Sequence, residues 1–253
     1  MILEMHRNRG ASKISVESQE VAEPIIREYQ VLTHLNVCDS PECTRLATQA
    51  RTGRHLSVLS AVENSDSQQA VEVRLCEDDY PGWLKVQDLE KLEIATRSYH
   101  ALQVNRAEIC VRLPEVVSFT QDAMAQPNRY LWGGTVGPNF DCSGLVQAAF
   151  DSVGIWLPRD AYQQEDFLHP VAIGDVESGD LIFFGLEKRA THVGLYIGEG
   201  EYIHSSGIDH GRDGIGIDRL SSPRDEISDR LFQMMRRAGR VTESYQPRNR
   251  NPQ

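Results

Sequence analysis

The sequence predicts an α+β protein in which a small antiparallel β-barrel comes before a domain whose helices precede its strands. In residues 25–97, short apolar runs alternate with turn-rich pieces such as "NSDS" and "DDYPG", a spacing typical of small barrels. In residues 115–240, helical patterns come first and strand patterns follow, an order that favours α+β over an alternating parallel-sheet fold.

The composition is that of a globular chain with no nucleic-acid surface. At 253 residues, with 40% hydrophobic and 25% charged residues, the chain is long enough for one large domain or two modest ones. Its formal net charge is −11, and neither half is basic, so we expect no nucleic-acid partner.

The sequence also predicts a cytoplasmic protein without a membrane partner. The beginning of the chain lacks an apolar run of signal-peptide length, and no segment approaches the about 18 apolar residues of a membrane span. Five cysteines, an odd number without dense spacing, indicate reduced thiols rather than a disulfide framework. The sequence leaves the oligomeric state open.

Changes in pattern divide the chain into segments. A proline discourages helix in the residue before it, so the pair Leu113-Pro114 is expected to end a connector. After it, "PEVVSFTQDAMAQP" and "DCSGLVQAAFDSVG" predict helices, the second ended by Gly154, and "GDLIFFG" and "HVGLYIGEGEYIHSS" predict strands. The expected segments are a flexible leader, the barrel, the connector, the second domain and a tail, at residues 1–24, 25–97, 98–114, 115–240 and 241–253 respectively. The end of the tail, "QPRNRNPQ", is expected to be frayed.

Cys142 is a candidate nucleophile because it stands at the predicted start of a helix. The positive end of a helix dipole helps to lower a thiol pKa, and a first-turn N–H lacks an intrahelical acceptor and can stabilise an oxyanion. Taken alone, a cysteine is more often a small buried hydrophobic residue, so the assignment depends on what accompanies it.

Two histidines are candidates for the base and the group that orients it. His192 opens the strand "THVGLYIG" and His204 ends "EYIHSS", with a "GEG" turn between them. In an antiparallel hairpin these strand ends lie across from each other if the register permits. Thiolate and imidazole also bind zinc, so Cys142, His192 and His204 are an alternative metal-ligand set, although no short CxxC or HxxxH pair supports it.

The ordered motifs "DCSGLV", "GDLIFF", "THVGLYIG" and "YIHSS" resemble the NlpC family of papain-like cysteine peptidases, which act on bacterial cell-wall peptides. The resemblance implies that Cys142 is the nucleophile, His192 the general base and His204 the group that orients this base. It also implies that Tyr130 of "RYLWGG" helps to line the oxyanion site. No metal or organic cofactor is required for such a reaction.

The stretches "LNVCDSP" and "GWLKV" resemble the opening and closing motifs of bacterial SH3-like domains. A barrel of that kind before the peptidase domain resembles the members that cleave γ-D-glutamyl bonds. The implied reaction is hydrolysis between γ-D-Glu and a diamino acid, meso-diaminopimelate or lysine, in peptidoglycan stem peptides with a free N-terminal L-Ala. In the cytoplasm this reaction would serve cell-wall recycling.

The resemblance also implies residues for the amine end of this substrate. Asp141 is expected to bind the free amine, although it could equally cap the helix. From the barrel, Tyr80 in "CEDDYPGW" is expected to close that end, with Glu77, Asp78 or Asp79 as an acidic partner.

Candidates for the α-carboxylate of D-Glu and its polar surroundings are Ser143 and the pair Arg159 and Asp160 in "LPRDAYQQ". The chain departs from the family pattern at Ala161, where Ser or Thr is frequent. Three alternatives stay open: an exported wall-remodelling hydrolase, a wall-peptide binding protein that does not cleave, and an acyltransferase that uses an amine acceptor.

Overall fold

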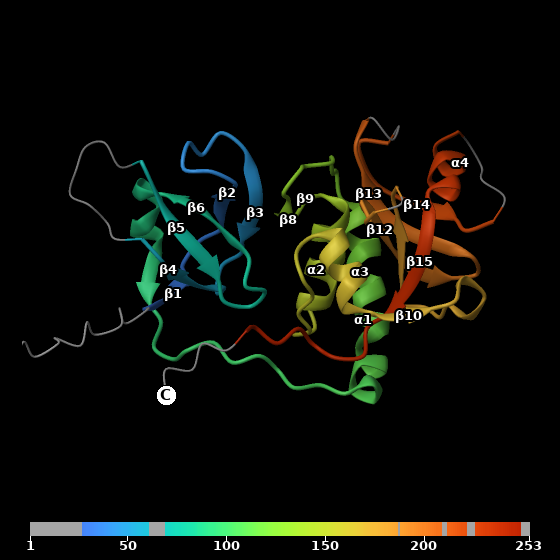
Figure 1. Ribbon diagram of the computed structural model, residues 1–253, viewed down its shortest axis with the longest axis horizontal. Coiled ribbons are helices and arrows are strands. Elements are labelled where there is room, and N and C mark those ends of the chain that lie inside the picture. The colour runs from blue at the N-terminus through green and yellow to red at the C-terminus, as the bar shows by residue number, and fades with distance from the viewer. Residues whose placement is uncertain (1–26, 61–68, 187, 209–211, 222–225, 249–253) are drawn as a thin grey trace, which may run out of the picture.

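The computed structural model shows two lobes side by side, a barrel from the N-terminal part of the chain and a sheet covered by helices from the rest (Figure 1). This arrangement confirms the predicted α+β class. The expected leader, residues 1–24, lies outside the described residues. The described residues are 27–60, 69–186, 188–208, 212–221 and 226–248.

The first lobe is an antiparallel sheet of seven strands in the order β3-β2-β6-β5-β4-β1-β7. Alternate side chains such as Val37, Val71, Val73 and Leu84 point to its interior and are fully buried, which is the period expected of a strand with one solvated face. The elements are β1 (Glu28–Val31), β2 (Leu35–Cys38), β3 (Leu46–Ala50), β4 (His55–Val58), β5 (Ala70–Leu75), β6 (Pro81–Lys85), the 3₁₀ helix η1 (Val86–Lys91) and β7 (Leu92–Ile94).

A long helix, α1 (Arg106–Ala125), replaces much of the expected connector. The prediction of a connector over residues 98–114 is therefore wrong from Arg106 onward. A capping box begins the helix: the Asn105 side chain accepts from the Glu108 N–H at 3.1 Å, and the Glu108 carboxylate accepts from the Asn105 N–H at 2.8 Å. Pro114 lies on the exposed face, where water can reach the carbonyl that it leaves unpaired. The buried face that holds the helix in place consists of Ile109, Leu113, Val116 and Thr120.

The second lobe is built on a six-stranded sheet in the order β10-β15-β11-β12-β13-β14. In its strand β11, Leu181 and Phe183 pack in one core cluster with α1 and α2, whereas Ile182 and Phe184 pack in another with Leu231 of α4. The strand is buried on both sides, which explains its unbroken apolar run. No helix among the described residues has the length and apolarity to cross a membrane. The remaining elements are β8 (Thr135–Val136), β9 (Asn139–Phe140), α2 (Cys142–Asp151), α3 (Ala161–Phe167), β10 (His169–Val171), η2 (Ile173–Asp175), β11 (Leu181–Phe184), β12 (His192–Gly198), β13 (Glu201–Ser206), β14 (Gly214–Arg219), α4 (Glu226–Gln233) and β15 (Met235–Arg240).

The described part of the expected tail, residues 241–248, is packed. The expectation that "QPRNRNPQ" is frayed is wrong for its described residues, since the Arg248 N–H donates to Asp79 Oδ2 at 2.6 Å. Val241 is fully buried in the core. The Ser244 hydroxyl accepts from the Trp156 N–H at 2.9 Å, and the Tyr245 N–H donates to the Trp156 carbonyl at 2.7 Å. These backbone contacts fix the segment after β15 against the helical side of the lobe.

Polar contacts join the two lobes near the end of β3. Arg51 donates to both carboxylate oxygens of Asp151, at 2.5 and 2.8 Å. The Gln49 side chain accepts from the backbone N–H groups of Thr135 and Val136, each at 3.1 Å. The barrel is therefore held against the segment that leads into α2.

Candidate active site

Cys142 is the first residue of α2, and its neighbours explain why the helix begins there. Asp141 caps the helix, since its Oδ1 accepts from the Gly144 N–H at 2.7 Å, which confirms the capping interpretation. Gly144 must be glycine, because a Cβ at this position would lie 2.0 Å from the carbonyl oxygen of Gly134. The Cys142 N–H, in the first turn, is available for an oxyanion.

The surroundings of Cys142 favour the neutral thiol over the thiolate. Burial raises the pKa of Cys142 to about 12, and the Asp141 carboxylate adds to the rise, while backbone N–H groups of Val193 and Ser143 oppose it. Desolvation of the sulfur therefore outweighs the lowering that its helix position led us to expect. Attack on a carbonyl requires a base, and the Val193 contact places the sulfur beside the start of β12, where His192 lies.

His192 and His204 meet across the hairpin, which confirms the prediction about their strand ends. His192 Nε2 lies 2.8 Å from His204 Nδ1, and the rings are perpendicular. Gly194 leaves room for this packing, since a Cβ there would lie 2.6 Å from Tyr202 Cδ2. Because His192 Nε2 is used in this contact, Nδ1 is the nitrogen that can take a proton from Cys142. Within the described ranges, no three His, Cys, Asp or Glu side chains form a group that could hold a metal ion.

The sequence analysis missed two residues that continue this line of contacts. His204 Nε2 lies 2.9 Å from Asp218 Oδ2, and Arg212 pairs with both oxygens of Asp218. The register pairs His204 with Gly216, which precedes Asp218 by two positions on the same face of β14. Only this register identifies Asp218, because no motif in the sequence marks it.

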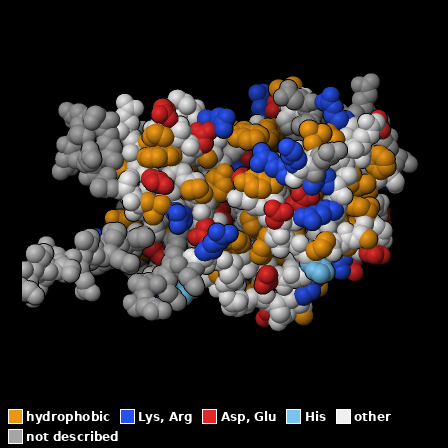
Figure 2. Space-filling view, in the orientation of Figure 1, with side chains coloured by type: hydrophobic (Ala, Val, Ile, Leu, Met, Phe, Trp, Pro, Cys, Tyr) orange, Lys and Arg blue, Asp and Glu red, His pale blue; other side chains and the backbone are white. Residues whose placement is uncertain are grey.

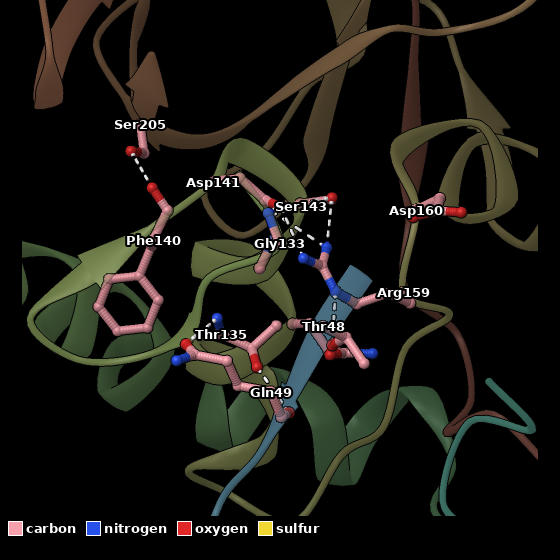
Figure 3. A network of polar contacts seen from close by, with 12 residues as sticks. Thr48, Gln49, Gly133, Thr135, Phe140, Asp141, Ser143, Arg159, Asp160 and Ser205 are labelled. Atoms are coloured by element: carbon pink, nitrogen blue, oxygen red, sulfur yellow. Dashed lines mark hydrogen bonds and ion pairs between the residues drawn. The ribbon is translucent and has the colours of Figure 1, made fainter. Parts of the chain in front are cut away.

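Arg159 is bound to the residues on either side of Cys142. Its Nη2 and Nη1 donate to the two oxygens of Asp141 at 2.6 and 3.1 Å, and Nη1 also donates to Ser143 Oγ at 3.0 Å. Its Nε donates to Thr48 Oγ1 of β3 at 2.9 Å. Figure 3 shows the guanidinium pointing toward Asp141 and Ser143, whereas Asp160 points away from it. The structure thus brings Ser143 and Arg159 together, and their binding of a substrate carboxylate stays a prediction.

A cavity of about 360 Å³ lies between the lobes and is lined by Cys142. On the face seen in Figure 2, hydrophobic side chains and Lys or Arg side chains gather over the middle of the molecule. Tyr80 reaches the cavity from the barrel, and its hydroxyl donates to Asp160 Oδ1 at 3.3 Å. Tyr80 and Cys142 therefore line the same cavity, whose volume suits a small ligand, and the binding of substrate by Tyr80 stays a prediction.

The acids proposed to accompany Tyr80 lie elsewhere, so that prediction is wrong. Glu77 and Asp78 form buried pairs with Arg54 at 3.2 and 2.9 Å, and Asp79 binds the C-terminal segment. None of the three lines the cavity. The buried guanidinium of Arg54 accounts for this, because a desolvated charge requires nearby counter-charges.

Three arginines line the cavity, and they differ in their partners. Arg159 has its carboxylate partner within the site, and Arg45 Nε lies 2.6 Å from Asp39 of the barrel. Arg189 lies over the ring of Tyr162, 5.0 Å from the centroid, and is paired with no carboxylate among the described residues. Among the described residues that line the cavity, Arg189 is therefore the cation that a substrate anion could neutralise.

Tyr130 lines the cavity with Cys142, where the resemblance places it. Burial, with Cys142 and Asp141 nearby, raises the pKa of its phenol, so the hydroxyl remains a donor at neutral pH. In the part of the chain that the structure describes, this hydroxyl has no hydrogen-bond partner. It is therefore able to donate to a developing oxyanion.

Both lobes match known domain families. Residues 127–235 match the NlpC/P60 family, and residues 37–89 match the bacterial dipeptidyl-peptidase SH3 domain. The first range contains Cys142, His192 and His204, and the second contains Tyr80. The predicted pair of domains is confirmed.

Similar proteins cover parts of the chain. The gamma-D-glutamyl-L-lysine dipeptidyl-peptidase of Bacillus subtilis is 44% identical over 79 residues, which are 30% of this chain and 27% of that protein. The murein DD-endopeptidase MepS/murein LD-carboxypeptidase of Escherichia coli is 36% identical over 114 residues, 44% of this chain and 60% of that protein. The crystal structure of an NlpC/P60 family protein from Bacillus cereus matches 88% of this chain and 66% of its own, with a TM-score of 0.45 and 23% identity. The chain thus spans less than two thirds of the length of either curated relative.

Proposed function

Because residues 127–235 form a domain of the NlpC/P60 family of cysteine peptidases behind a bacterial SH3 domain, we propose that this protein hydrolyses γ-D-glutamyl bonds in peptidoglycan stem peptides. The bond cleaved joins γ-D-Glu to a diamino acid in peptides that begin with a free L-Ala. The observation that carries the proposal is that Cys142 and the barrel residue Tyr80 line one cavity. The name of the Bacillus subtilis relative supports the same bond class.

The reaction runs through a thioester. His192 Nδ1 takes the proton of Cys142 as the sulfur attacks the γ-carbonyl. The oxyanion receives hydrogen bonds from the Cys142 N–H and the Tyr130 hydroxyl. His192 then gives its proton to the amine of the departing diamino acid. In the second half-reaction, His192 activates a water that hydrolyses the thioester and releases the L-Ala-γ-D-Glu product.

We place the free amine of the substrate at Asp160 and Tyr80. The Tyr80 hydroxyl contacts Asp160 at 3.3 Å, and both residues line the cavity. Asp141, which the resemblance favours for this task, already accepts two bonds from Arg159 and the N–H groups of Gly133 and Gly144. Asp141 thus acts by holding Arg159 and the helix start, and Asp160 is the acid better placed for an ammonium group.

The proposed setting is the recycling of imported wall fragments in the cytoplasm. None of the five cysteines, all of which lie among the described residues, forms a disulfide, which supports a reducing compartment. Fractionation of the native host tests this setting: activity that copurifies with a cytoplasmic marker supports it, and activity released with the envelope would favour wall remodelling instead.

The reaction is tested with L-Ala-γ-D-Glu-meso-diaminopimelate and its N-acetylated form, with products followed by mass spectrometry. We expect release of diaminopimelate from the free tripeptide and little from the acetylated one, with Cys142→Ala as the inactive control. Equal cleavage of both peptides would contradict the amine subsite. Cleavage of neither, with tight binding retained in Cys142→Ala, would show a binding protein, and dipeptide transfer to added amines would show an acyltransferase.

A further inference from the structure

We propose that Asp218 sets the tautomers of both active-site histidines and so determines which nitrogen of His192 is the base. His192, His204 and Asp218 form one line of contacts, 2.8 and 2.9 Å long. All three are buried, with exposed fractions of 4%, 0% and 1%. Asp218 touches no reacting atom and is therefore a positioning residue. The inference rests on the proposed function only through the role of His192 as base.

The assignment follows from what each group can donate. An ionised carboxylate only accepts hydrogen bonds, so the proton on His204 lies on Nε2, facing Asp218. A neutral imidazole carries one N–H, so His204 Nδ1 is an acceptor and His192 Nε2 must supply the hydrogen between the rings. His192 Nδ1 is then unprotonated. The two neutral histidines can both carry their proton on Nε2 or both on Nδ1. Only the first arrangement leaves His192 Nδ1 with a lone pair that can accept the thiol proton.

The surroundings of Asp218 maintain its charge. Arg212 donates to both carboxylate oxygens, which compensates a charge taken out of water. Gly216, opposite His204, lets Arg212 lie close to the strand, because a Cβ there would be 3.0 Å from Arg212 Cδ. When His192 becomes an imidazolium during the reaction, the positive charge is stabilised through His204 by the carboxylate of Asp218.

The change Asp218→Asn keeps the shape but allows an amide N–H to donate to His204 Nε2. The two tautomers then reverse, and His192 Nδ1 carries a hydrogen and cannot accept one. We expect kcat on the free tripeptide to fall about 10²- to 10⁴-fold with KM nearly unchanged, the effect of a wrong tautomer in other acyl-transfer sites. The matched control is Asp180→Asn. Asp180 is a fully buried carboxylate of the same domain, paired with Arg240 at 2.7 and 2.9 Å. We expect the kcat of Asp180→Asn to stay within about twofold of the wild-type value.

Long-range ¹H–¹⁵N NMR spectra of the whole protein test the tautomers without reference to activity. We expect Nε2–H forms of His192 and His204 in the wild type and Nδ1–H forms in Asp218→Asn. An Nδ1–H form of His192 in the wild type would overturn the proposal, and this measurement decides the matter even if the variant does not fold. Retention of both tautomers and of kcat in a folded Asp218→Asn would also overturn it. If the wild type does not hydrolyse the tripeptide, the proposed function fails while the tautomer assignment is still tested.

Discussion

At the scale of single residues, the polar side chains of the site are of two kinds. Some form ion pairs, and others line the cavity without such a partner among the described residues. Asp141 and Arg159 form a buried ion pair, and removal of one partner from such a pair is strongly destabilising. Asp218 is a buried carboxylate that pairs with the partly exposed Arg212. Tyr130 and Arg189 differ, because each lines the cavity and has a polar group without an acidic or hydrogen-bonding partner among the described residues. These two residues are therefore the ones whose removal should change catalysis with little loss of folding.

Tyr130→Phe removes the phenolic donor while keeping the ring. Because removal of one oxyanion donor costs about 10²- to 10³-fold in kcat, we expect a fall of about 100-fold on the free tripeptide with a small change in KM. Steady-state kinetics measure both. Tyr245→Phe is the control, since that hydroxyl contacts Asp79 outside the cavity. A Tyr130→Phe enzyme with unchanged kcat would contradict a role in oxyanion stabilisation.

Arg189→Gln tests which diamino acid the cavity prefers. meso-Diaminopimelate carries a carboxylate that lysine lacks, and a hydrogen bond between charged groups contributes about 1.5–3 kcal/mol, or roughly 10- to 100-fold. We expect the wild type to prefer the diaminopimelate peptide in kcat/KM and Arg189→Gln to lose that preference. Arg219→Gln is the control, because Arg219 pairs with Glu201 away from the cavity. Equal use of both peptides by the wild type would argue against this subsite.

At the scale of elements, the sequence predicts a helix or a strand well where the signal lies within a few neighbouring residues. The stretch "DCSGLVQAAFDSVG" predicts α2, with Asp141 as a possible cap, and the stretch "HVGLYIG" predicts β12, as observed. The expectation for residues 98–114 is wrong because the capping box at Asn105 and the buried face of α1 stabilise the helix, and Pro114 lies on its exposed face. Asp218 was missed because it joins the site only through the pairing of β13 with β14. The register in which two strands pair is not marked by any short motif in the sequence.

Gly144→Ala tests how the start of α2 is built. The added Cβ would lie 2.0 Å from the backbone oxygen of Gly134 and 2.9 Å from Asp141 Oδ1, so the helix start must shift. Because overpacking against backbone costs typically 1–3 kcal/mol, we expect a lower Tm and loss of most activity. Gly174→Ala is the matched control, since its Cβ would meet no atom within 4 Å. Wild-type Tm and kcat in Gly144→Ala would refute the packing argument.

At the scale of the whole molecule, both lobes contribute walls to the cavity that Cys142 lines. Thr48 of the barrel accepts from Arg159, which in turn holds Asp141 beside the nucleophile. Tyr80 of the barrel contacts Asp160 at the start of α3. The barrel thus supplies one wall of the cavity and part of the support for the nucleophile's helix. We therefore expect substrate selection by the charge of the peptide end to depend on both domains.

The Asp160 carboxylate in this cavity predicts how binding of the substrate's free amine depends on pH. Burial raises the pKa of Asp160 above its ordinary value of 3.8, although the Arg159 guanidinium opposes the rise. As the pH falls from neutral through this raised pKa, Asp160 takes up a proton and loses the charge that attracts an ammonium group. Binding of the free tripeptide to Cys142→Ala should therefore weaken on acidification at a higher pH than for an ordinary aspartate, whereas binding of the N-acetylated peptide should not follow this titration.

Calorimetric titrations between pH 4 and pH 8 measure this difference. In the double variant Cys142→Ala with Asp160→Asn, both peptides should bind with similar affinity and the pH dependence of the free peptide should disappear. Asp39→Asn in the same background is the matched control, because Asp39 lines the same cavity from the barrel but is paired with Arg45. If Asp39→Asn and not Asp160→Asn removes the pH dependence, the amine lies at the barrel acid. The contact between Tyr80 and Asp160 would then serve only to hold the two lobes together.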